Sequence, residues 1–103
     1  MPKISSGKRY AQAAFELALE RNELESWEEG LKKIADLTKD EEFIALLQNP
    51  RLPFDAKKSL LEKRLAEINP LAFNLALLLV SKGILRRGGD ILQQYNALLD
   101  AHR

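Results

Sequence analysis

The stretch that decides the fold is LAFNLALLLV at residues 71–80, in which every residue except Asn74 is apolar. Asn69-Pro70 comes before it as a helix N-cap followed by a first-turn proline, and Gly83 follows it as a helix C-cap. We therefore expect a helix whose only polar line is Asn74 with Ser81. It is about half as long as a membrane-spanning helix, which needs ~20 apolar residues. A helix that is apolar all round either lies in the centre of a bundle or is partly covered by another molecule, and this stretch fits both.

A second segment, near the N-terminus, is also more apolar than an ordinary surface helix. On a helical wheel, its clearly polar strip holds only Arg9, Gln12, Glu16 and Glu20. The apolar arc covers about two-thirds of the circumference, whereas a surface helix needs roughly 100°. One side of this arc carries Tyr10, Ala13, Ala14 and Leu17. The small alanines suit close contact with a neighbouring helix. Together, the two apolar helices also suit an exposed groove that receives an amphipathic partner helix.

Local patterns predict four further helices and no strand. Asp40 is a natural N-cap, Asn49-Pro50 stops the helix that follows it, and Trp27 belongs to an apolar stripe expected in the core. No segment alternates with period 2. The expected fold is an all-α six-helix bundle forming one domain over residues 1–103, with helices at about 5 or 6 to 21, 23–38, 40–48, 54–68, 70–83 and 90–102, the last possibly starting at Leu85.

Composition argues against catalysis and against cofactor binding. The chain of 103 residues has 46% hydrophobic and 30% charged residues, which is typical of a globular domain, and no cysteine. Its single histidine, His102, leaves a metal site to carboxylates alone, and residues 40–42 lack the alternating ligands of a calcium loop. No triad order, phosphate-binding glycine loop or carboxylate dyad is present. We expect a non-enzymatic, soluble, cytoplasmic docking domain without a metal or cofactor.

Two other functions remain open from the residues alone. The basic pairs Lys57-Lys58, Lys63-Arg64 and Arg86-Arg87 suggest a nucleic-acid-binding domain. Acidic residues are interleaved with them, and the net charge is only +1, so a solvated face explains them better than a nucleic-acid site. The other alternative is a bundle that associates with itself through the same apolar groove.

The segment RYAQAAFELA at residues 9–18 resembles the opening signature of the delta subunit of F-type ATP synthases, whose mitochondrial counterpart is the oligomycin-sensitivity-conferring protein. Other landmarks follow in the family's order and cover essentially the whole chain: Trp27, LLQNP at 46–50, residues 57–61, Asn74-Leu75 and Lys82-Gly83. Two positions depart from the family pattern. Ile84 stands where an arginine is usual, and Gly88-Gly89 where Leu-Pro is usual, so the turn before the last helix is in question.

The resemblance implies a concrete, mechanical function. It identifies the chain as the N-terminal domain of a longer stator subunit at the cytoplasmic face of the bacterial inner membrane, with no direct membrane insertion and no nucleic acid bound. This domain would hold the N-terminal helix of an alpha subunit between its first and fifth helices, while the absent C-terminal domain joins the b subunits of the peripheral stalk. The implied groove residues are Tyr10, Ala13, Ala14 and Leu17 on one wall and Asn74, Leu77, Leu78 and Ser81 on the other.

Overall fold

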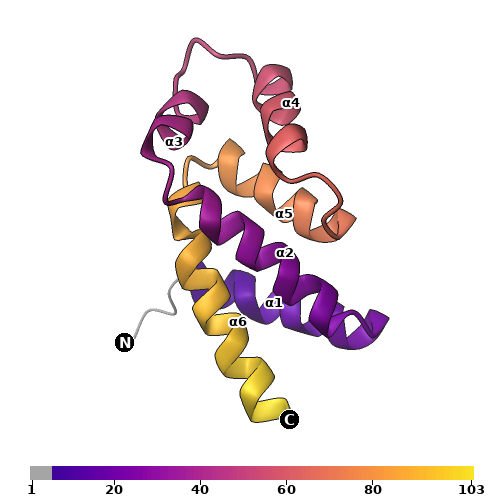
Figure 1. Ribbon diagram of the computed structural model, residues 1–103. Coiled ribbons are helices and arrows are strands. Elements are labelled where there is room, and N and C mark those ends of the chain that lie inside the picture. Colours follow the sequence, from indigo (N-terminus) through magenta and orange to yellow (C-terminus); the bar gives the residue numbers. More distant parts are fainter. Residues whose placement is uncertain (1–5) are drawn as a thin grey trace.

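The computed structural model describes residues 6–103, with side chains from residue 7 onward. Every regular element in this range is helical, which confirms the all-α prediction (Figure 1). The serine N-cap predicted for the first helix, at Ser5 or Ser6, lies outside the described residues and side chains. The elements are α1 (Ser6–Arg21), α2 (Leu24–Leu37), α3 (Glu41–Leu47), α4 (Phe54–Arg64), α5 (Pro70–Ser81), the 3-10 turn η1 (Leu85–Arg87) and α6 (Gly88–His102).

The helices form two connected groups. α6 packs against both α1 and α2, and α5 contacts α2 and α4; α3 and α4 lie at the other end of the molecule (Figure 1). Trp27 and Tyr95 are the largest fully buried side chains, and the Tyr95 hydroxyl donates a hydrogen bond to the Leu24 carbonyl at 2.7 Å. Aliphatic residues of α2 and α6 complete this part of the core: Leu31, Ile34, Ile91 and Leu99.

The start of α5 is fixed by its cap. The Asn69 side-chain oxygen accepts a hydrogen bond from the Leu71 amide at 2.8 Å, as expected of an N-cap. The Asn69 side-chain nitrogen donates to the carboxylate of Glu23 at 2.6 Å and to the hydroxyl of Ser26 at 3.1 Å. One buried asparagine therefore both starts α5 and ties this helix to the beginning of α2.

The end of α5 is a Schellman motif. The Gly83 amide donates to the Val80 carbonyl at 3.0 Å, and the Ile84 amide donates to the Leu79 carbonyl at 2.9 Å. Gly83 has φ +70°, a left-handed conformation that glycine adopts without strain. Ile84 contributes its backbone amide to this motif, so the unusual residue at this position is compatible with an ordinary helix end.

Two helix boundaries differ from the sequence prediction. α4 ends at Arg64 rather than near Ile68, because the chain leaves helical geometry at Leu65 and takes a left-handed conformation at Glu67 (φ +66°). This turn lets Leu65 enter the core and brings Asn69 to its bonds with α2. α6 begins at Gly88, earlier than the predicted Asp90, after the short turn η1.

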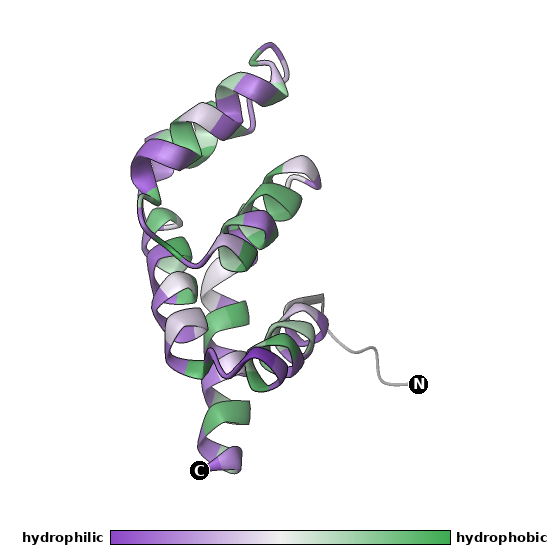
Figure 2. Ribbon diagram, turned by 90° about the vertical axis from the view of Figure 1, so that its right-hand side faces the viewer, coloured by the Kyte–Doolittle hydropathy of each residue, from purple (hydrophilic) through white to green (hydrophobic). Residues whose placement is uncertain are grey.

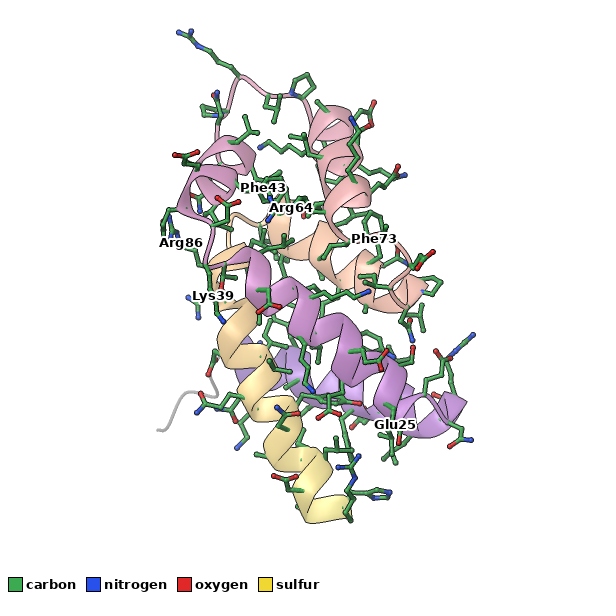
Figure 3. The ribbon with its side chains drawn as sticks, viewed as in Figure 1. Glu25, Lys39, Phe43, Arg64, Phe73 and Arg86 are labelled. Carbon is green, nitrogen blue, oxygen red and sulfur yellow. The ribbon has the colours of Figure 1, made fainter. Side chains whose placement is uncertain are left out.

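The α3 and α4 helices are joined by polar contacts at the surface. The Asp40 carboxylate accepts the Phe43 amide at 3.1 Å and the Arg64 guanidinium at 3.1 Å. These two hydrogen bonds hold the pKa of Asp40 below its usual value. Arg64 also lies over the Phe43 ring, 4.4 Å from its centroid (Figure 3). Arg86 pairs with Glu41 at 2.9 Å. Arg64 and Arg86, two of the basic residues that suggested a nucleic-acid-binding face, therefore pair with acidic residues of the same chain.

Candidate functional site

An apolar groove of about 370 Å³ lies between α1 and α5. Four residues from each of these helices form its walls, and a single residue of α2, Trp27, contributes between them. In Figure 2, the view runs nearly along α1, which joins the grey N-terminal trace, and along α5 above it; both ribbons carry hydrophobic residues. The groove is lined by Tyr10, Ala13, Ala14, Leu17, Trp27, Leu71, Asn74, Leu75 and Leu78.

The α1 wall is built from small and medium-sized side chains. Ala14 is buried, whereas Ala13 is exposed at the rim and Leu17 leaves 39% of its surface exposed. Ala11 and Ala18 are fully buried on other sides of the same helix. Alanines therefore have two places in α1: some allow close packing inside the bundle, and Ala13 leaves the rim of the groove without a bulky side chain.

The α5 wall explains why this helix is apolar on all sides. One face is fully buried in the core through Ala72, Ala76 and Leu79. The other face is open, with Asn74 exposed and Leu78 41% exposed. The interpretation of the 71–80 stretch as a central helix is therefore correct for one face, and the other face is open to the groove.

Trp27 forms the α2 part of the groove. It is only 2% exposed, as expected of a core residue, yet it also lines the groove. Its indole N–H donates no hydrogen bond to any described residue. Because a buried N–H without a partner costs free energy, this atom is kept in place by the packing of the ring.

Six of the eight residues predicted for the groove line it together. The two others do not: Leu77 is half-buried against the core, and the Ser81 hydroxyl donates back to the Leu78 carbonyl at 2.8 Å. The prediction missed Leu71, Leu75 and Trp27. Leu71 lies three residues before Asn74, and Leu75 lies three residues before Leu78, so helical spacing could have found them. Trp27 could not be found this way, since its place depends on how α2 crosses behind the other two helices.

None of the residues that line the groove is charged. Arg9, Glu16 and Glu20 are exposed along the outer edge of α1, and Lys82 is exposed at the end of α5. Within residues 6–103, no cluster of three or more potential metal ligands is found, and no helix has the length and apolar character needed to cross a membrane. The groove offers an apolar surface with a few polar groups at its rim, which suits binding of an amphipathic helix.

Comparison with known proteins places the chain in a family. Residues 7–103 match the family model of the ATP synthase delta (OSCP) subunit. The ATP synthase subunit delta of Dehalococcoides mccartyi is 39% identical over 98 residues, which cover 92% of this chain and 52% of that protein. The mitochondrial ATP synthase peripheral stalk subunit OSCP of Rhinolophus ferrumequinum is 32% identical over 97 residues, covering 92% of this chain and 46% of that protein.

A relative of lower identity also matches most of this chain and about half of its own length. The ATP synthase subunit delta of Escherichia coli O81 is 28% identical over 92 residues, which cover 89% of this chain and 52% of that protein. The chain spans about half the length of the curated relatives that it matches. The family model extends over nearly the whole chain, from the start of α1 to the end of α6. The chain therefore belongs to the ATP synthase delta (OSCP) subunit family.

Proposed function

We propose that this chain is the part of an ATP synthase stator subunit that binds the catalytic head, by holding the N-terminal helix of an alpha subunit in the groove between α1 and α5. The observation that carries the proposal is the groove itself. Its walls come from the two helices with surplus apolar surface, and six of its nine lining residues are those implied by the family resemblance. The role is mechanical: the domain transmits force and performs no chemical step.

The binding energy would come from covering apolar side chains. Leu17 and Leu78 are each about 40% exposed and face the same groove. Burying apolar surface contributes about 25 cal/mol per Å², offset by the entropy lost on association. Asn74, exposed at the rim, can bond a polar group of the partner and thereby help to fix its register.

The remaining partners belong to the same proposal. Since the relatives are about twice as long as this chain, a further domain would join the b subunits of the peripheral stalk. The assembled subunit would then lie at the cytoplasmic face of a bacterial inner membrane as a peripheral part of the complex. In this arrangement, the domain links the catalytic head to the stalk and prevents the head from turning with the rotor.

The test is a calorimetric titration of the chain with a synthetic peptide of the alpha subunit's N-terminal segment. Ala13→Asp places a charge at the groove rim, and we expect it to abolish binding because the carboxylate would have to be desolvated under the docked helix. Ala97→Asp is the matched control, since Ala97 is exposed on α6, away from the groove lining. It should bind the peptide as the unchanged chain does.

Two results would contradict the proposal. The first is equal affinity of the unchanged chain and a folded Ala13→Asp variant, with helicity checked by circular dichroism. The second is absence of peptide binding together with binding to duplex DNA that weakens steeply with salt, which would favour a nucleic-acid-binding domain. Sedimentation of the chain alone would reveal self-association through the groove.

A further inference from the structure

A second hollow, of about 250 Å³, lies where α4 ends and α5 begins, and we call it the α4–α5 pocket. Its apolar lining comes from both sides of the turn between these helices and includes Leu65, Ile68, Pro70 and Phe73. The side chains of Glu62 and Glu67 line it as well. The pocket is smaller than the ~300–1,000 Å³ of typical small-molecule sites, so it suits a single side chain of a partner.

The α4–α5 pocket is separate from the groove between α1 and α5. No residue lines both hollows. On a wheel at ~100° per residue, Phe73 lies about 140–160° from the three leucines of α5 that line the groove. The groove therefore accounts for one open face of α5, and the half-buried Phe73 belongs to another.

The two carboxylates of the pocket have no basic partner in the part of the chain from residue 6 to residue 103. Glu62 and Glu67 are exposed, and neither forms an ion pair there. No lining residue is basic. Lys63 is exposed next to Glu62 in sequence, but it neither lines the pocket nor pairs with either glutamate. An unbalanced negative charge thus borders an apolar surface.

The backbone at Glu67 is unusual for a charged residue. Its φ of +66° is left-handed, a conformation that residues other than glycine and asparagine rarely adopt. Such conformations persist where the surrounding structure fixes them, and they cluster at binding sites. The chain keeps a carboxylate at a position where glycine would fit better, and that residue lines the pocket.

The same chain shows what such a combination of groups binds. The Arg64 guanidinium lies 4.4 Å from the centroid of the Phe43 ring and bonds the Asp40 carboxylate at 3.1 Å. Figure 3 shows this pair beside α3, with Phe73 apart from it on α5. A guanidinium can stack on an aromatic ring and bond a carboxylate at the same time. The α4–α5 pocket offers both kinds of group, an aromatic ring and carboxylates, and its lining contains no cation.

We infer that the α4–α5 pocket binds an arginine side chain of a partner polypeptide. The guanidinium lies against the Phe73 ring and bonds the carboxylates of Glu62 and Glu67. Lysine suits the pocket less well, because its ammonium group is more strongly hydrated and has no planar face to stack. Since the pocket and the groove share no residue, both can be occupied at once, and this inference does not depend on the proposed function.

The test uses blocked amino acids as probes. N-acetyl-arginine methylamide and its uncharged analogue, N-acetyl-citrulline methylamide, are titrated into the isotope-labelled chain at low salt. We expect the arginine probe to shift the amides of residues 62–68 and the ring signals of Phe73. The citrulline probe should bind about three- to tenfold more weakly. Equal binding of the two probes, or shifts spread over glutamates elsewhere with Phe73 unchanged, would overturn the inference.

Removing one carboxylate tests the assigned residues. Glu62→Gln should weaken arginine binding by about two- to fivefold at low salt, and the difference should shrink as salt is added. Glu29→Gln is the matched control, because it makes the same change at an exposed position of α2 outside the pocket. Equal affinities of these two variants would contradict the role of Glu62.

A second variant keeps the test independent of folding. Glu67→Asn removes the other carboxylate and introduces a residue that tolerates the left-handed conformation. We expect a similar loss of arginine binding with no fall in the free energy of unfolding. Unchanged affinity of this variant would contradict the inference, whereas binding of the alpha-subunit peptide in the groove would remain a separate result.

Discussion

At the scale of single residues, Tyr95 shows how the core holds a polar group. Its side chain is fully buried on α6, where its ring meets Phe15 edge to face and its hydroxyl donates to the Leu24 carbonyl at 2.7 Å. Burial raises the pKa of Tyr95 to about 12, with the nearby charge of Glu28 acting in the same direction. The folded chain therefore favours the neutral phenol more strongly than the unfolded chain does.

This shift predicts a loss of stability in alkali. Tyrosine in an unfolded chain has a pKa of about 10. The stabilisation from Tyr95 is therefore complete below pH 10 and is lost as the pH rises from about 10 to 12. Urea unfolding across this range should show the free energy of unfolding falling with pH. Tyr95→Phe should flatten that fall; a Tyr95→Phe curve parallel to that of the unchanged chain would be the contrary result.

At the scale of helices, the sequence predicted best where the signals are local. Both ends of α5 follow from their caps, because Asn69 and Gly83 act on backbone groups within a few residues. The end of α4 could not be predicted in this way. Glu67 adopts a left-handed backbone conformation although it is neither glycine nor asparagine, so its residue type gives no signal of the turn. The turn instead accompanies the burial of Leu65 and the bonds of Asn69 to α2.

The groove was predictable only in part, for a related reason. The surplus apolar surface of α1 and α5 is visible in the sequence, but the precise lining depends on helix rotation. Leu77 turns toward the core, while Leu71 and Leu75 turn toward the groove. The contribution of Trp27 comes from the crossing of α2 behind α5, which is a contact between helices distant in sequence.

The contact between α2 and α5 leads to a prediction about stability. A Cβ atom at Gly30 of α2 would lie 2.8 Å from the Cβ of Ala72 in α5, so Gly30→Ala must push the two helices apart. We expect the free energy of unfolding to fall by about 1–3 kcal/mol. Peptide binding should also weaken, because Trp27 lies one turn earlier on the same helix and lines the groove.

Gly89→Ala serves as the control for this substitution. A Cβ at Gly89 meets no atom within 4 Å, so this change should leave both unfolding and peptide affinity nearly unaltered. Both quantities can be measured by urea unfolding and calorimetry on the same samples. Equal behaviour of the two variants would show that the α2–α5 contact does not support the groove.

At the scale of the whole molecule, the groove lies where the two groups of helices meet. α1 and α2 belong to the group packed around α6, whereas α5 connects this group to α4 (Figure 1). Because its lining comes from α1, α2 and α5, the groove exists only in the folded bundle. Under the proposed function, this property matters because the surface that binds the catalytic head must keep its shape under load.

The most direct test of groove binding is a titration of the isotope-labelled chain with the alpha N-terminal peptide, followed by amide chemical shifts. We predict that the largest changes fall on residues 10–17 of α1, on residues 71–78 of α5 and on the indole N–H of Trp27, with little change in α4. Changes concentrated on the basic residues of α4, or no changes at saturating peptide, would contradict the account.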